Sequence, residues 1–186
     1  MATDKAIQNP HIFYYVQDSH WNTVDSKDFW DVGNSDNGLY DAVTHKSVKS
    51  VYDPSPVGYK TPEPAAWTRF TKYNNGDNTN SSHYFNVANN SSTFLADGGW
   101  KFYTQADGQG DWDLWHALGF RDVYSQRTPT AGTGGLLGVG SSGYYWSCGP
   151  STTATLGRYL NFSSGSVNPQ SRDFRADGLT VRPVSE

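Results

Sequence analysis

Residues 143–184 read GYYWSCGPSTTATLGRYLNFSSGSVNPQSRDFRADGLTVRPV. Near the start of this stretch, Tyr144, Trp146 and Cys148 occupy alternate positions, with Tyr and Ser between them. In a β-strand alternate side chains point to the same face, so these three residues are predicted to share one face of a strand. The irregular mixture of aromatic, small and charged residues that follows suggests a scaffold that displays a surface.

Two more strands are expected in the same stretch. Leu160 and Phe162 alternate with polar or aromatic neighbours, and residues 163–166, SSGS, supply the turn of a hairpin that returns through Val167. Residues 179–182 alternate again and predict a last strand. Several short strands so close together predict a small antiparallel sheet.

Size and composition favour one folded domain. The chain has 186 residues and a mass of 20.6 kDa, which is enough for a hydrophobic core without disulfides or metals. Aromatic residues make up 15% of it, so the core is expected to rest on a few large rings. The net charge of -4 and the pI near 5.6 argue against binding to nucleic acid or to an anionic membrane surface.

The sequence gives little information about cellular compartment. Its one cysteine, Cys148, cannot form an internal disulfide. No apolar run approaches the roughly 20 residues of a membrane-spanning helix, and residues 1–10 lack the layout of a signal peptide. We therefore expect no membrane insertion by this chain.

Upstream of the C-terminal stretch, the patterns predict short elements joined by loops. Thr61 has the features of a helix N-cap, followed by proline and an acid, and Trp67 and Phe70 would give that helix a buried face to about Tyr73. The other expected segments are a strand over 11–15, aromatic anchors at Trp21, Phe29 and Trp30, a loop over 74–92, a strand over 100–103, a loop over 107–119 pinned by Trp112 and Trp115, and a surface excursion over 128–140.

No recognisable catalytic or metal-binding motif appears. The five histidines are scattered, and Asp113 and His116 would meet only on one turn of a helix. Asp111 and Asp113 look like turn residues beside tryptophans. Residues 77–80 resemble a calcium loop only in having oxygen ligands, since the closing glutamate is missing. We expect no enzyme activity, no metal and no cofactor.

The C-terminal half uses a restricted set of charged residues. Every lysine lies at or before Lys101, and glutamate occurs only at Glu63 and Glu186. Charge in the C-terminal half comes from arginine and aspartate, with tyrosine and serine plentiful. Antibody paratopes use much the same residues, because Tyr and Arg supply contact area while Ser, Gly and Asn supply adaptable hydrogen bonds.

Two segments together resemble a known protein family. Residues 51–62, VYDPSPVGYKTP, look like its "YDPCPxGYxVP" signature, and residues 140–147, GSSGYYWS, with 181–184, VRPV, look like its "GSxGxYWSS…NF…VRPV" ending. The family consists of domains from gut bacteria and their phages with C-type-lectin folds of the formylglycine-generating-enzyme type. Many members are variable proteins of diversity-generating retroelements. The resemblance implies an α+β, C-type-lectin-like fold with small antiparallel sheets, one or two helices and long loops.

The resemblance also implies how part of the sequence arises. In these systems a template RNA is copied with errors at adenines, so AAC codons scatter over many residue types, among them Tyr, Ser, Asp, Arg and Phe, but not Lys or Glu. The resemblance therefore divides the single domain, 1–186, into a scaffold, 1–120, and a variable, ligand-displaying region, 121–184. The implied variable residues are Val123, Tyr124, Tyr144, Cys148, Thr155, Arg158, Tyr159, Ser171, Arg172, Asp173, Phe174 and Asp177.

This sequence also departs from the family pattern. Ser55 stands where the family often has cysteine, and Cys148 where it often has serine, so no family disulfide is implied. The cysteine pair of formylglycine-generating enzymes and the calcium motifs of true C-type lectins are missing, so only the fold is expected to be shared. Arg182 is expected to pair with an acid in the scaffold, and Tyr144 has a core position as its alternative.

The expected function is non-enzymatic recognition of a protein or glycan ligand on a cell surface, without nucleic acid. The protein would act on a bacterial surface or a phage particle. Aromatic anchors and charged selectors would make the binding surface. Two alternatives remain open: a structural or assembly module of a surface appendage or phage particle, and a degenerate enzyme.

Overall fold

The computed structural model describes residues 8–9, 30–31, 47–67, 70, 91–105, 109–122, 135–151, 153 and 155–186. The expected strand over 11–15 and the anchors Trp21 and Phe29 lie outside these residues. So do positions 74–90 of the expected loop and the implied variable residues Val123 and Tyr124.

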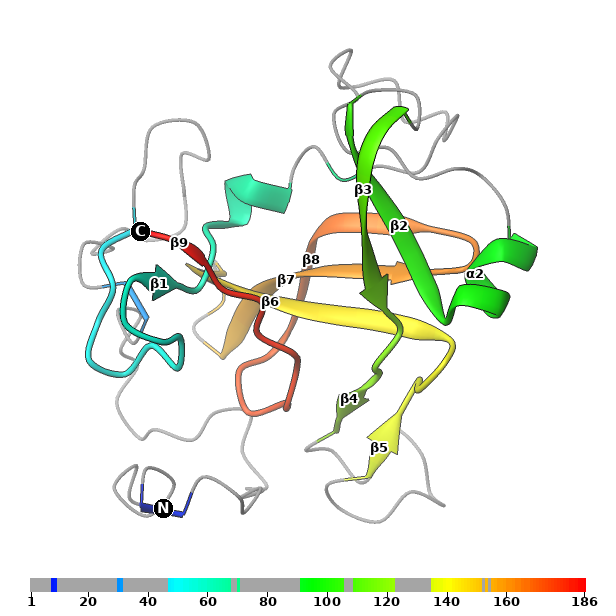
Figure 1. The fold of residues 1–186 in the computed structure, drawn as a ribbon. Coiled ribbons are helices and arrows are strands. Elements are labelled where there is room, and N and C mark those ends of the chain that lie inside the picture. The colour runs from blue at the N-terminus through cyan, green and yellow to red at the C-terminus, as the bar shows by residue number, and fades with distance from the viewer. Residues whose placement is uncertain are drawn as a thin grey trace.

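Small antiparallel sheets and one short α-helix make up most of the described structure (Figure 1). This agrees with the predicted α+β class. The elements in chain order are β1 (Tyr59–Lys60), the 3-10 helix η1 (Pro64–Trp67), α2 (Ser91–Asp97), β2 (Gly99–Gln105), β3 (Gln109–His116), β4 (Phe120–Arg121), β5 (Leu136–Leu137), β6 (Ser142–Pro150), β7 (Leu156–Ser163), β8 (Val167–Phe174) and β9 (Val184–Ser185).

The central sheet has the order β6-β7-β8, and its strands come from the stretch with alternating residues. Leu160 lies opposite Tyr145 and Phe162 opposite Gly143, so these residues share one face, which we call the core face. Leu160 and Phe162 are fully buried. The predicted turn over 163–166 is confirmed, because the backbones of Ser163 and Ser166 exchange hydrogen bonds of 2.9 and 3.4 Å.

The β2–β3 hairpin crosses the core face of this sheet at a steep angle (Figure 1). Phe102 packs against Phe162 with ring centroids 5.7 Å apart, and Trp115 against Tyr145 at 4.8 Å. Two hydrogen bonds fix the crossing: Trp100 Nε1 donates to Ser163 O at 2.8 Å, and Tyr145 Oη donates to His116 O at 2.8 Å. The core is therefore aromatic, as the composition predicts.

The predicted strand over 100–103 is confirmed within β2, but the expected loop over 107–119 is wrong. Residues 109–116 form β3, paired with β2 along most of its length. Trp115 is buried, as an anchor should be, whereas Trp112 lies on the opposite face of the hairpin and is half exposed. Asp111 and Asp113 are consequently exposed strand residues and not turn residues.

Two helical expectations also need correction. Residues 91 and 92 begin α2 and do not end a loop; Phe94 of that helix packs on Trp100 at 5.0 Å. The helix expected from Thr61 to Tyr73 is only the four-residue η1 among the described residues. Thr61 is not at the N-cap position, because η1 begins three residues later at Pro64; its hydroxyl donates to Asp53 Oδ1 at 3.0 Å. Trp67 and Phe70 are nevertheless both buried, as predicted.

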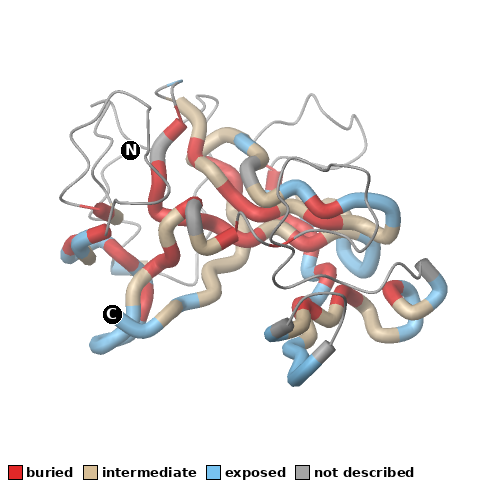
Figure 2. Tube along the Cα trace, turned by 90° about the horizontal axis from the view of Figure 1, so that it is seen from above, coloured by how far each residue is buried: buried red, intermediate tan, exposed pale blue. Residues whose placement is uncertain are grey.

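The expected last strand over 179–182 is replaced by single bridges. Gly178 pairs with Arg121 and Thr180 with Tyr145, and regular pairing returns only where β9 meets β1. Residues 178–186 thus cross the molecule in contact with several elements in turn. Figure 2 shows buried positions concentrated along the central strands and exposed positions in turns and at the C-terminus.

Candidate functional site

The implied variable residues of β7 and β8 lie directly opposite one another. The register pairs Tyr159 with Ser171, Arg158 with Arg172, Gly157 with Asp173 and Leu156 with Phe174. Because side chains alternate along each strand, successive pairs point to opposite faces of the sheet. The sheet therefore brings these residues of β7 and β8 close together but divides them between its two faces.

Arg158, Arg172 and Phe174 belong to the core face, beyond the end of the aromatic core. Arg158 is two residues before the fully buried Leu160. Arg172 is exposed, while Arg158 and Phe174 are half-buried. These three side chains, with Leu156 opposite Phe174, form the candidate surface that we call the arginine patch.

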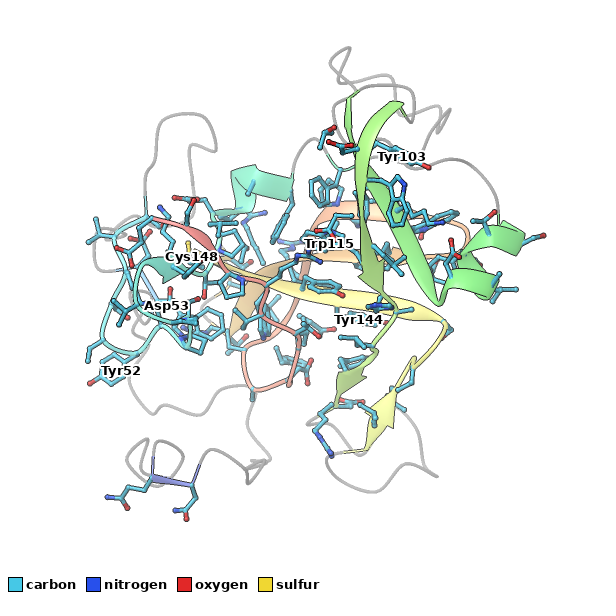
Figure 3. The ribbon with its side chains drawn as sticks, viewed as in Figure 1. Tyr52, Asp53, Tyr103, Trp115, Tyr144 and Cys148 are labelled. Atoms are coloured by element: carbon cyan, nitrogen blue, oxygen red, sulfur yellow. The ribbon has the colours of Figure 1, made fainter. Side chains whose placement is uncertain are left out.

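Tyr159, Ser171 and Asp173 belong to the other face, which we call the second face. Tyr159 is buried between Tyr144, at 5.8 Å, and Trp146, at 5.7 Å between ring centroids. Tyr144 in turn contacts Phe120 at 4.6 Å and points toward β4 (Figure 3). The half-buried Tyr144 therefore packs within an aromatic cluster, which matches its alternative as a core residue.

Three implied variable residues are buried in this structure and do not contribute to its surface. They are Cys148, Tyr159 and Asp177, each less than a tenth exposed. The backbone N of Cys148 donates to Pro62 O at 2.9 Å, which holds the end of β6 against the segment before η1 (Figure 3). The implied residues that remain accessible are Tyr144, Thr155, Arg158, Ser171, Arg172, Asp173 and Phe174.

The electrostatics of the arginine patch are unusual for a sheet. Burial lowers the pKa of the Arg158 guanidinium, and the neighbouring charge of Arg172 lowers it further. Like charges placed directly opposite each other on neighbouring strands are destabilising. The β7–β8 pair thus places two positively charged side chains directly opposite each other.

Arg182 meets the expectation that it pairs with an acid. It forms an ion pair with Asp113 of β3, and its guanidinium lies 4.3 Å from the centre of the Trp115 ring. Asp113 therefore has a structural role, because it links β3 to the C-terminal segment through Arg182. It lies on a strand with His116, so the two do not meet as they would on a helical turn.

Among the described residues, no three His, Cys, Asp or Glu side chains gather as metal ligands would. No helix in the described part of the chain is long and apolar enough to cross a bilayer.

The sequence patterns missed the residues that organise the loop over 51–61. Asp53 is buried there, and its carboxylate accepts hydrogen bonds from Ser55 N at 2.8 Å and Thr61 N at 2.8 Å. Lys49 Nζ donates to the carbonyl oxygens of Ser55 at 2.6 Å and Pro56 at 2.7 Å. An Asp before a proline is a turn signal, but its long-range partner Thr61 has no local signature.

No protein-family model matches the chain, and comparisons with curated proteins and with solved structures give no match either. The functional assignment therefore depends on the residues themselves.

Proposed function

We propose that this protein is a non-enzymatic recognition domain of C-type-lectin-like fold that binds a protein or glycan on a cell surface. Its ligand would be contacted by C-terminal strand residues that a diversity-generating retroelement varies. The observation that carries the proposal is the position of the arginine patch, at the end of the β7–β8 pair that lies away from the turn. Its charged and aromatic side chains are suited to recognition, and the same β7 strand continues into Leu160 and Phe162, which are fully buried.

The arrangement of the sequence signature supports the same proposal. Its first part, residues 51–62, and its last part, residues 181–184, are far apart in the chain. In space β1 pairs with β9, so that Lys60 lies opposite Val184, and Pro62 O accepts a hydrogen bond from Cys148 N. The segments that carry the resemblance thus pack on one another as parts of one scaffold.

Resequencing of this gene across a population of its source organism tests the proposal. We expect substitutions at codons 155, 158 and 171–174, with Trp146, Leu160, Phe162 and Arg182 constant. Buried positions such as Cys148 and Asp177 should vary less, because core substitutions destabilise the fold. A uniform sequence with no near-copy template nearby would contradict diversification.

A second candidate function is an assembly module of a surface appendage or phage particle. It is favoured by large apolar side chains that remain exposed around the 51–59 loop, namely Val48, Val51, Tyr52, Val57 and Tyr59. Figure 3 shows Tyr52 at the periphery of the molecule, while Asp53 points into the loop. Light scattering separates the two functions: a stable oligomer that Val57→Asp dissociates supports assembly, and a monomer supports recognition.

A further inference from the structure

We propose that Arg158 and Arg172 together bind an oxyanion, namely a phosphate, sulfate or carboxylate group carried by the ligand. The inference deepens the proposed recognition function, on which it rests, by naming the chemistry of the group that the surface selects. It is argued from the register of β7 and β8, the charges of the patch and the burial around it.

The register places Arg158 and Arg172 on neighbouring strands at the same point of the sheet. Arg158 and Arg172 are directly opposite each other, a position in which Cβ atoms are about 4.5–5.5 Å apart. The adjacent acid, Asp173, is paired with Gly157 and so belongs to the second face. Its Oδ1 accepts a hydrogen bond from Phe174 N at 3.0 Å. The alternation of the strand therefore separates this carboxylate from the two arginines.

The energetics of the pair favour a bound anion. Burial raises the cost of charging Arg158, and the charge of Arg172 raises it further. An anion between them is attracted to both positive charges, and the partial burial of Arg158 strengthens its attraction because the local dielectric is lower than that of water. A ligand group with one or two negative charges is thus attracted by two arginines at once.

The geometry of arginine determines the kind of anion. Each guanidinium is a planar fork whose N–H groups match two oxygens of a carboxylate, sulfate or phosphate. Two forks on adjacent strands present donors from two directions, which suits a group with two or more oxygens. Phe174 and Leu156, opposite each other beside the pair, add a partly apolar neighbour for the rest of the ligand.

The backbone beneath the pair is held in place. Ser147 Oγ donates to the carbonyl oxygen of Arg158 at 2.9 Å, and the next core-face residue, Leu160, is fully buried. Arg175 N donates to Thr155 O at 3.0 Å just beyond the pair. A preorganised backbone reduces the entropy lost when the side chains close on an anion.

The test titrates the purified full-length chain with sodium sulfate, sodium phosphate and sodium acetate, using sodium chloride at matched ionic strength as the reference. Binding is followed by calorimetry and by NMR of the arginine side chains. We expect saturable binding of at least one of the three oxyanions, but not of chloride. Arg172→Gln and Arg158→Gln should each weaken it about tenfold or more. Arg121→Gln, at an exposed arginine of β4 outside the pair, is the matched control and should bind as the parent does.

Several results would overturn the site. They are the absence of saturable binding by all three anions, equal loss in Arg121→Gln, and unchanged binding in an Arg172→Gln variant whose thermal unfolding matches that of the parent. Preference for sulfate or phosphate assigns a tetrahedral group, and preference for acetate assigns a carboxylate; either supports the pair. Population variation at codons 158 and 172 without anion binding would reject the anion site and leave the proposed recognition function standing. Anion binding by a protein whose sequence is invariant across the population would reject diversification and leave the anion site standing.

Discussion

Asp53 shows how one buried carboxylate can determine the path of a whole loop. It accepts hydrogen bonds from Ser55 N, Thr61 N and the Thr61 hydroxyl, all within 3.0 Å. Asp53→Ala would leave these donors without a partner in a buried site, so we expect the free energy of unfolding to fall by about 3 kcal/mol. Urea denaturation measures the loss. The control, Asp111→Ala at an exposed site, should change stability by less than about 0.5 kcal/mol; equal effects would contradict the role of Asp53.

Tyr145 makes the stability of the protein depend on alkaline pH. Burial raises the pKa of its phenol from 10.0 to about 12 in the folded protein, although the charge of Arg182 opposes the shift. Between these values the folded state retains a proton that the unfolded state has lost. Stability should therefore be complete below pH 10 and fall as the pH rises toward 12, by up to about 3 kcal/mol.

Urea unfolding at several pH values checks this expectation against Tyr145→Phe. The variant lacks the hydrogen bond to His116 O and is expected to be less stable at neutral pH. Its stability should fall less steeply above pH 10, because its residue 145 does not titrate. Parallel pH profiles for the two proteins would show that Tyr145 ionises normally in the fold.

At the scale of elements, the β6–β7 pair depends on a glycine that faces an aromatic ring. Gly143 lies opposite Phe162, and a Cβ added there would meet that ring at 2.1 Å. We expect Gly143→Ala to destabilise the protein by about 3 kcal/mol or more, since the ring is fully buried and cannot move aside. Adding Phe162→Leu should recover part of the loss by making room.

The matched control for this substitution is Gly165→Ala in the β7–β8 turn. A Cβ at Gly165 has no heavy atom within 4 Å. Thermal unfolding should therefore leave this variant close to the parent. If Gly143→Ala were equally harmless, the packing of Phe162 against the β6 backbone would be looser than the structure indicates.

Elements with strong local signals were predicted well, and those that depend on distant partners were not. The alternating side chains of β6 and β7 and the Ser-Ser-Gly-Ser turn can be recognised from the sequence alone. The stretch that forms β3 contains Gly and Asp, which favour a turn locally, but pairing with β2 overrides that preference. At Thr61 the backbone N and the hydroxyl both donate to Asp53, eight residues earlier, and the described helical turn, η1, begins only at Pro64.

At the scale of the whole molecule, residues 178–186 tie together strands from different sheets. Arg182 is central, since it stacks on Trp115 and pairs with the exposed Asp113. We expect Arg182→Ala to lower the free energy of unfolding by about 1 kcal/mol. Most of that loss should persist in the Asp113→Ala background and at high salt, because an exposed ion pair is screened while the stacking contact is not. A loss that disappears in either condition would assign the effect to the ion pair.

The candidate site was predicted in part. The resemblance supplies positions in β7 and β8, and the structure brings Arg158, Arg172 and Phe174 into one patch. Burial of Cys148, Tyr159 and Asp177 was not foreseeable, because it depends on the β6 register and on contacts from elsewhere in the chain. The direct opposition of the two arginines likewise depends on a register shift between β7 and β8 at Tyr159–Asn161; without it the pairing next to the turn would place Arg158 opposite Ser171. No single residue in the sequence signals this shift.

The division of β7 and β8 between two faces has a consequence for any combinatorial library built on this protein. Randomising codons 171–174 together would place new side chains on both sides of the sheet at once. Selection for binding would then enrich alternate codons, while their neighbours would be filtered for folding alone. Read counts from such a selection should therefore oscillate with a period of two codons, so that the pleat of the sheet could be read from enrichment data without a structure.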